Sequence, residues 1–161
     1  MVLSLPYHLL FYCLLLSVLL FGSLAINPRA WLHRMPPAVR RKVAPRSNRE
    51  KRQLLFTGIP FLIVLIAYPV LYTVPLNAGH LKTFLIISAF FMAFDVWDTL
   101  VLDLWIFVRL TPCFLRVPGT EKEDYSDRRY HIRSGLKGLI FLLIAACLLS
   151  AIIALIPVRG A

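Results

Sequence analysis

Long apolar stretches alternate along the chain with short stretches that are rich in Lys and Arg. We expect bilayer-crossing helices at about residues 3–26, 54–76, 83–108 and 137–158, because each stretch can span about 30 Å of hydrocarbon at helical rise. The first stretch has neither a preceding basic segment nor a small-residue cleavage site, so we interpret it as a retained helix. The pattern predicts an all-α fold, with one transmembrane domain built as a four-helix bundle.

The composition agrees with this class, because 59% of the residues are apolar and only 16% are charged, against about 25% charged residues in soluble domains. The net charge of +10 comes mainly from two connectors, one after the first predicted span and one before the last. Basic loops stay in the cytoplasm, so we expect both termini outside and a multi-pass protein of the cell membrane. The connectors contain no nucleic-acid-reading motif, so membrane lipids are the expected partners and nucleic acid is not.

Three carboxylic acids interrupt the third predicted span, at Asp95, Asp98 and Asp103. An ionised carboxylate in hydrocarbon costs about 2.5 to 3.5 kcal/mol or more, so intramembrane acids generally have a function. At about 100° per residue, the three acids and Arg109 share one helix face of roughly 140°, which we expect to point into the bundle. These acids form the predicted intramembrane polar site.

The chain offers few cations to balance these acids, because no Lys, Arg or His lies at midplane depth in the predicted spans. Asp95 and Asp98 must therefore be protonated, face water, or meet a cation from outside the chain. Asp103 and His131 could form an acid–base pair at the membrane surface. The side chains considered as partners or headgroup contacts are Arg109, Arg116, Arg128, His131, Arg133, Lys137 and Tyr68, with Tyr72, Ser17 and Ser150 as further hydrogen-bond partners.

Other local patterns predict structure. Ser47 and Glu50 have the spacing of a capping box at the start of a helix, while Pro60 and Pro69 should kink the second span. Ala146, Ser150 and Ala154 form a small-residue stripe that favours close helix packing, within the bundle or between protomers. Three cysteines, Cys13, Cys113 and Cys147, have no metal-ligand spacing and are expected to be free thiols.

Several short segments along almost the whole chain resemble an uncharacterised family of small four-span prokaryotic integral membrane proteins. They include Asn27-Pro28-Arg29, Phe94-Asp95, Leu102-Asp103, Arg116-Val117-Pro118-Gly119-Thr120-Glu121, Tyr130-His131 and Leu136-Lys137-Gly138. The resemblance implies the four-span fold and a prokaryotic membrane. It implies no activity and no cofactor.

Three function classes fit the sequence. The leading hypothesis is an accessory or assembly subunit whose acids pair with a cation of another membrane protein, because the chain has no complete catalytic set. The second is an ion- or proton-coupled transporter or channel, oligomeric because no internal repeat is visible. The third is an intramembrane enzyme acting on a lipid or lipid-linked phosphate, with Asp98 and Asp103 as acid, base or metal ligands, although no nucleophile motif or HExxH spacing is present.

Overall fold

The computed structural model describes residues 4–155, and every regular element within that range is helical. Four helical segments are long and apolar enough to cross a membrane: α1 (Leu5–Ile26), α3 (Asn48–Thr73), α4 (His80–Trp97) with the π-helix η3 (Asp98–Leu110), and α5 (Arg128–Leu155). The predicted all-α fold with four apolar helices is therefore confirmed. Residue 3 of the first predicted span and residues 156–158 of the last lie outside the described residues.

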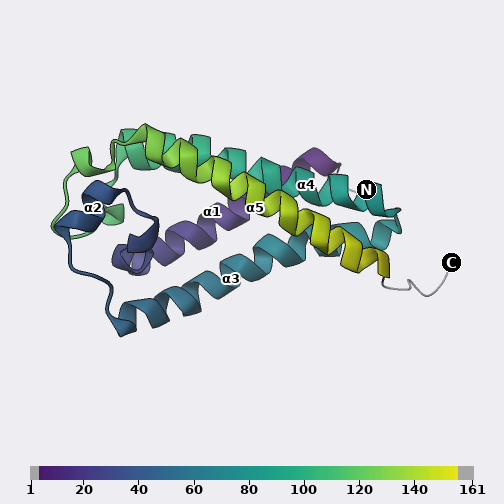
Figure 1. The fold of residues 1–161 in the computed structure, drawn as a ribbon, viewed down its shortest axis with the longest axis horizontal. Coiled ribbons are helices and arrows are strands. Elements are labelled where there is room, and N and C mark those ends of the chain that lie inside the picture. The colour runs from purple at the N-terminus through teal and green to yellow at the C-terminus, as the bar shows by residue number, and fades with distance from the viewer. Residues whose placement is uncertain (1–3, 156–161) are drawn as a thin grey trace.

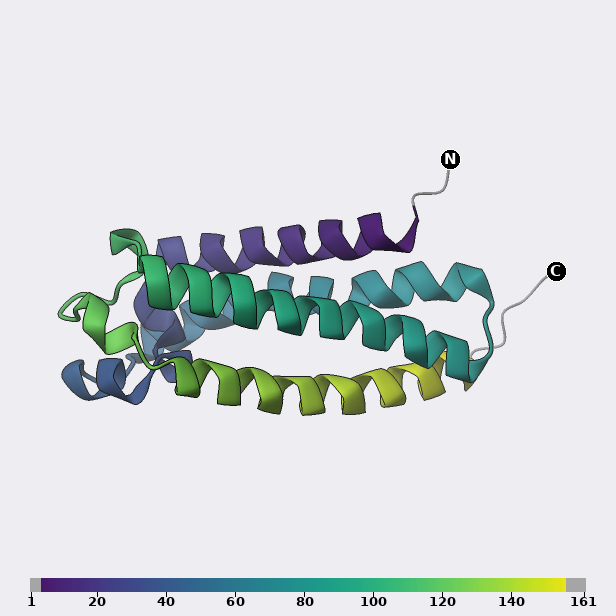
Figure 2. The same cartoon turned by 90° about the horizontal axis from the view of Figure 1, so that it is seen from above.

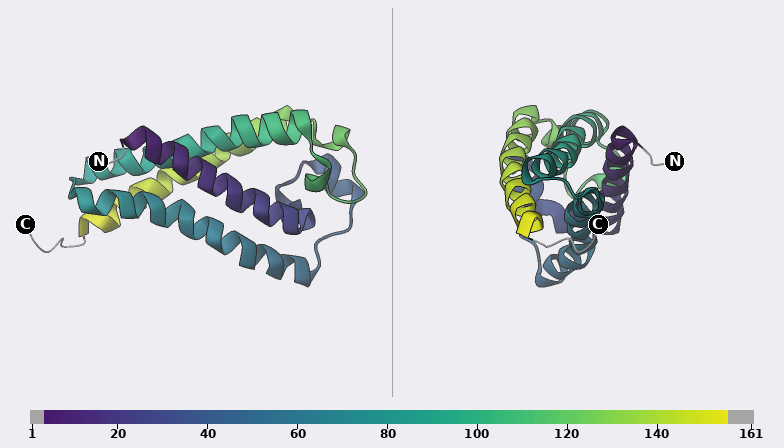
Figure 3. Two further views of the ribbon diagram at one scale, coloured as in Figure 1. Left: turned by 180° about the vertical axis from the view of Figure 1, so that it is seen from behind. Right: turned by 90° about the vertical axis from the view of Figure 1, so that its right-hand side faces the viewer.

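The long helices run side by side, and the start of α1 lies at the same end of the bundle as the end of α5 (Figures 1 and 2). The short helix α2 (Pro37–Lys42) lies at the opposite end, which we call the connector end. Helix α5 packs along α4 and η3, whereas α1 contacts both α3 and α4. Viewed along the bundle, α1 and α5 lie on opposite sides of α4 (Figure 3). Helices α3 and α5 spread apart towards the connector end (Figure 1).

Two of the helices begin before their apolar stretches. Helix α3 begins at Asn48, because Ser47 Oγ accepts from Glu50 N at 3.2 Å and Glu50 Oε2 accepts from Ser47 N at 2.7 Å, which forms the predicted capping box. Helix α5 begins at Arg128, where Asp127 Oδ1 accepts from Tyr130 N at 3.0 Å. The apolar pattern marks the stretch suited to hydrocarbon, whereas polar capping groups decide where a helix starts.

The connector between α1 and α3 folds against the bundle. It contains the 3₁₀-helix η1 (Pro28–Arg34) and α2, and its side chains Leu32, Met35 and Val39 are buried in one apolar cluster with residues of α1 and η3. Burying an apolar side chain of this size away from water contributes about 1.5 to 3 kcal/mol. The packing fixes the position of the polar side chains that η1 carries.

The connector between η3 and α5 joins the same apolar cluster. It contains two 3₁₀-helices, η4 (Cys113–Leu115) and η5 (Lys122–Tyr125), and Leu115, Val117 and Tyr125 are buried. Tyr125 Oη accepts from Val117 N at 2.8 Å, and Lys42 Nζ lies 2.9 Å from an Asp124 carboxylate oxygen. The two connectors are therefore tied to each other at the connector end.

One of the two prolines in α3 explains a buried polar contact. Pro69 has no N–H, so the Leu65 carbonyl one turn earlier loses its helical donor. Tyr12 of α1 is fully buried and donates its hydroxyl to Leu65 O at 2.8 Å. Membrane helices tolerate proline when a neighbouring helix supplies such a donor. The 3₁₀-helix η2 (Val74–Leu76) then ends this span.

Two members of the small-residue stripe pack inside the bundle. Ala146 is completely buried against Ile87 and Phe91 of α4, and Ser150 is buried with its hydroxyl 3.2 Å from His80 Nε2. Ala154 is exposed. The first two residues therefore contribute to the α4–α5 contact. All three cysteines are free.

Candidate functional site

The three intramembrane acids lie where α4 changes into the π-helix η3. Asp95 is in the last turn of α4, whereas Asp98 and Asp103 are in η3. In a π-helix, backbone hydrogen bonds join residues five apart, so Asp103 lies one turn after Asp98 on nearly the same side of the helix. Regular α-helical winding would place these two residues about 140° apart. All three acids line one cavity, and Arg109, expected on the same face, is exposed and outside its lining.

The cavity has a volume of about 460 Å³ and is lined by every long helix and by η1. One wall comes from α3 and the facing wall from α5, the two helices that spread apart in Figure 1. Its polar lining groups are Asp95, Asp98, Asp103, His33, Arg34, Tyr130, His131 and Ser134. Its apolar lining includes Leu54, Phe61, Leu62, Leu65, Phe141 and Leu142. The cavity is therefore amphipathic.

His131 and Asp103 are brought together, as the sequence suggested. His131 Nδ1 lies 3.1 Å from Asp103 Oδ2, and His131 is only 5% exposed. Its second ring nitrogen, Nε2, is buried without a hydrogen-bond partner in the described part of the chain. A carboxylate that accepts from Nδ1–H leaves the lone pair on Nε2. The pair therefore has the arrangement of a histidine base oriented by a carboxylate.

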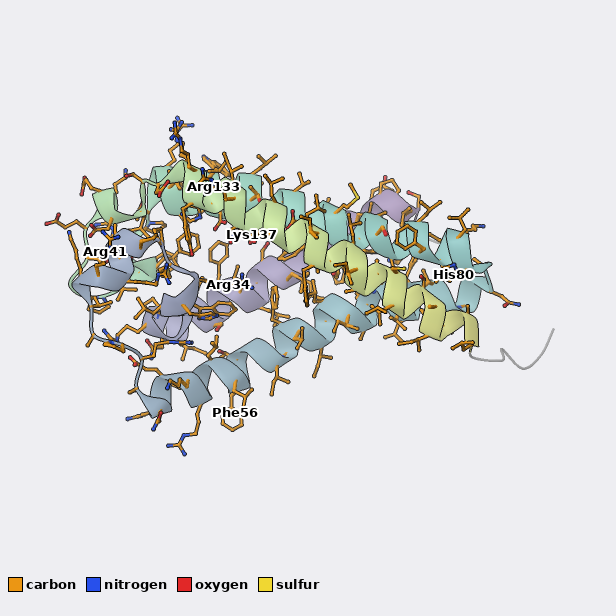
Figure 4. The ribbon with its side chains drawn as sticks, viewed as in Figure 1. Arg34, Arg41, Phe56, His80, Arg133 and Lys137 are labelled. Carbon is orange, nitrogen blue, oxygen red and sulfur yellow. The ribbon has the colours of Figure 1, made fainter. Side chains whose placement is uncertain are left out.

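Tyr130 secures the polar end of the cavity. Its hydroxyl donates to Arg34 O at 3.1 Å, which links α5 to η1. Its ring stands edge-on to the His131 ring, with centroids 5.5 Å apart. The contact holds Arg34 beside the cavity, between α5 and the α1–α3 pair (Figure 4).

Asp95 and Asp98 have no hydrogen-bond or ion-pair partner among residues 4–155. The side chains that the sequence offered are engaged elsewhere: Tyr68 bonds His8 at 2.9 Å, Ser17 accepts from Trp97 Nε1, and Ser150 bonds His80. Both aspartates are partly buried. The cavity thus holds two carboxyl groups whose polar atoms remain available.

Two glycines of α5 let the acidic helix approach closely. A Cβ on Gly138 would lie 2.9 Å from Asp95 Oδ1, and a Cβ on Gly135 would collide with Thr99 Oγ1. Small residues permit such close contact between membrane helices. Gly135 and Gly138 therefore position the acid-bearing helix against α5, and sequence reasoning singled out neither of them for this role.

Arg34 is the cation that sequence reasoning missed. It lines the cavity, although it comes from the connector after the first span and not from a span. No local signal in the sequence marks this role: Arg34 reaches the cavity because Leu32 and Met35, close to it in the connector, are buried against the bundle.

The remaining predicted contacts are spread over the connector end. Arg116 donates from Nε to Thr111 O at 2.9 Å, and Arg128 is exposed at the start of α5. Arg133 and Lys137 are exposed on α5 (Figure 4). They line a second hollow, of about 490 Å³, together with Pro37, Asp127, Arg129, Tyr130 and Ser134.

Two titratable groups of the first connector have shifted pKa values. Partial burial lowers the pKa of His33 below its ordinary value, and the positive charges of Arg46 and Arg34 lower it further. The hydrogen bond to Asp124 raises the pKa of Lys42. At neutral pH, His33 is therefore an uncharged lining group, and Arg34 is the cation of η1 that faces the acids.

The arrangement can accept a cation at Asp95 and Asp98 and a proton at His131 Nε2. Within the described residues, no group of three or more His, Cys, Asp or Glu side chains has the geometry of a metal site. Comparison of the chain with models of protein families, with curated proteins and with solved structures finds no match.

Proposed function

We propose that this chain is an integral membrane protein that binds an amphiphilic molecule with a cationic headgroup, taken up from the bilayer between α3 and α5. The connector end would face the cytoplasm, as its basic residues favour. The observation that supports the proposal is the cavity itself, where unpartnered Asp95 and Asp98 share one space with leucine and phenylalanine walls.

The charges of the cavity favour a cation. Three carboxyl groups face one guanidinium, that of Arg34, while His33 is uncharged at neutral pH. Ionised acids in a space of low dielectric are stabilised by an opposite charge within about 4 to 6 Å. A bound ammonium group would supply that charge, whereas a carboxylate would be repelled.

The size of the cavity suits part of such a molecule. Small-molecule sites generally measure about 300 to 1,000 Å³, and this cavity measures about 460 Å³. Lipid chains are as apolar as leucine, so moving a chain from the bilayer to the α3 and α5 walls contributes little free energy. Affinity and selectivity must therefore come from the headgroup and the acids.

A second candidate function is proton transfer on the bound amphiphile. It is favoured by His131, whose Nε2 is buried and unpartnered while Nδ1 is held by Asp103. A histidine so oriented can remove a proton from a hydroxyl or an ammonium group within hydrogen-bond reach. This candidate corresponds to the enzyme class that the sequence left open.

The accessory-subunit hypothesis uses the same acids. A cationic side chain of a partner's membrane helix could occupy the space between α3 and α5 in place of a small amphiphile. Gentle purification from membranes distinguishes the two, since a partner-dependent site should retain a membrane protein that Asp98→Asn no longer co-purifies.

The experiment measures binding of a fluorescent long-chain alkylamine to the protein in nanodiscs, beside its N-acetylated form and the matching fatty acid. We expect the amine to bind best and Asp98→Asn to weaken it at least about tenfold, the value of one lost charged hydrogen bond. The control Glu123→Gln removes one exposed acid of η5 outside the cavity and should change nothing. Equal binding of the three probes, or an unchanged affinity in Asp98→Asn, would overturn the proposal.

A further inference from the structure

The second hollow at the connector end is basic. Arg129, Arg133 and Lys137 line it, and they follow one another at intervals of four residues along one flank of α5. Residues four apart on a helix lie one above the other, so the three cations form a single column. Pro37 of α2 closes the opposite side. We call this hollow the basic groove.

The cations of the basic groove are not neutralised by the protein. No ion pair involves Arg129, Arg133 or Lys137 in the part of the chain that the structure describes. The only acid in the lining is Asp127, whose Oδ1 already accepts from Tyr130 N at the start of α5. Three positive side chains therefore face one carboxylate, and the groove favours an anion.

The donors in the groove match a phosphate group. Arginine can bind two phosphate oxygens at once through its planar guanidinium, and lysine adds a point charge. The Ser134 hydroxyl also lines the groove and is a further possible donor. Basic residues beside a membrane are expected from topology alone, but topology does not require them to surround a hollow that includes a hydroxyl.

The basic groove adjoins the acidic cavity. Tyr130 and Ser134 line both, and they separate the basic flank of α5 from the flank that carries His131, Gly135 and Gly138. Lys137 is the residue before Gly138, over which Asp95 packs. Helix α5 therefore has the basic groove on one flank and, on the adjacent flank, the cavity that contains the acids of α4 and η3.

We propose that the ligand is a phospholipid whose headgroup carries both a phosphate and an amine. The phosphate binds Arg133 and Lys137 in the basic groove, the amine reaches Asp95 and Asp98, and the acyl chains follow the apolar walls. The amine part of this inference rests on the proposed function, whereas the phosphate part rests on the groove residues alone. A lipid is favoured over free phosphate because the adjoining cavity has leucine and phenylalanine walls.

The test compares two variants of equal charge change. Arg133→Gln with Lys137→Gln removes two cations of the groove, and the control Arg40→Gln with Arg41→Gln removes two exposed cations of α2 outside it. The probe is fluorescent short-chain phosphatidylethanolamine, bound to the protein purified in a non-ionic glycoside detergent that contains no phosphate. We expect the groove variant to bind at least about tenfold more weakly and the control to stay within about twofold of the wild type. Thermal unfolding should show that both variants are folded.

Each further result decides one part of the inference. Equal losses of lipid affinity in the groove variant and in the α2 control would indicate non-specific attraction between charges. That result would overturn the proposal that the basic groove binds the phosphate. If the groove variant binds phosphatidylethanolamine normally while Asp98→Asn does not, the inference fails and the proposed function stands. If Asp98→Asn binds alkylamine normally while the groove variant loses phosphatidic acid binding, the proposed function fails and the phosphate site stands. Displacement of the lipid probe by millimolar inorganic phosphate would overturn the assignment to a lipid.

Discussion

The close contact between η3 and α5 gives a sharp prediction about Gly135. A methyl group at position 135 would collide with the Thr99 hydroxyl, whereas a methyl group at Gly22 of α1 has no atom within 4 Å. Both glycines are helical. The substitutions Gly135→Ala and Gly22→Ala are therefore chemically identical but meet opposite surroundings.

The magnitudes follow from two opposing effects. Replacing a helical glycine by alanine stabilises a helix by about 1 kcal/mol, and Gly22→Ala should show this gain alone. Overpacking a filled contact costs about 1 to 3 kcal/mol, and rotating Thr99 would not remove the crowding, because Thr99 Cβ and Cγ2 would also lie 3.4 Å from the new methyl group. Gly135→Ala should therefore be about 1 to 3 kcal/mol less stable than Gly22→Ala.

The assay is unfolding of the purified variants in one detergent, by heat or by titration with a denaturing detergent. A second substitution, Thr99→Ala, removes the hydroxyl and the methyl group that cause the collision. The double variant Gly135→Ala with Thr99→Ala should recover most of the loss, since the two residues are in contact. Equal stabilities of Gly135→Ala and Gly22→Ala, or no recovery in the double variant, would refute the proposed packing.

Three further predictions concern Tyr12, His33 and His131. Tyr12→Phe leaves the Leu65 carbonyl without a donor and should lower the unfolding free energy by about 1 to 3 kcal/mol, measured by unfolding in detergent. An unchanged stability would show that Tyr12 does not compensate for Pro69. The pKa of His33 is lowered from 6.5 in the folded connector, so the folded form binds fewer protons than an opened one. The connector should therefore become easier to cleave with a protease as pH falls below about 6.5, and His33→Gln should remove this pH dependence; a His33 NMR titration at or above 6.5 would contradict it. Nitrogen-15 NMR should show that neutral His131 carries its proton on Nδ1, because Asp103 accepts a hydrogen bond there. The Asp103→Leu variant should lose this preference. A proton on Nε2 in the wild type would exclude His131 as the proposed base.

Much of the fold could be predicted from local patterns. The apolar stretches identify the four long helices, and Ser47 with Glu50 marks the first turn of α3, because capping depends on residues three apart. Pro69 indicates a freed carbonyl, but its donor Tyr12 lies on another helix. Contacts of that kind depend on how helices pack, which a single sequence does not encode locally.

The candidate site could be predicted only in part. The acids are conspicuous in an apolar stretch, and the pairing of Asp103 with His131 follows from their shared depth. The π-helical winding of η3, which turns Asp98 and Asp103 to one side, has no local signal in the sequence. The same is true of Arg34, which reaches the cavity only because the connector around it folds against the bundle.

The most direct test of the amphiphile cavity is photo-crosslinking in membranes with a long-chain alkylamine that carries a diazirine in its chain. Mass spectrometry of the labelled protein should find the probe on the half-buried cavity residues Phe61, Leu65 and Leu142. Excess unlabelled alkylamine and the Asp98→Asn substitution should both remove these labels. Labels on outward residues such as Phe56 of α3 (Figure 4), unchanged by competitor and by Asp98→Asn, would contradict a selective intramembrane site.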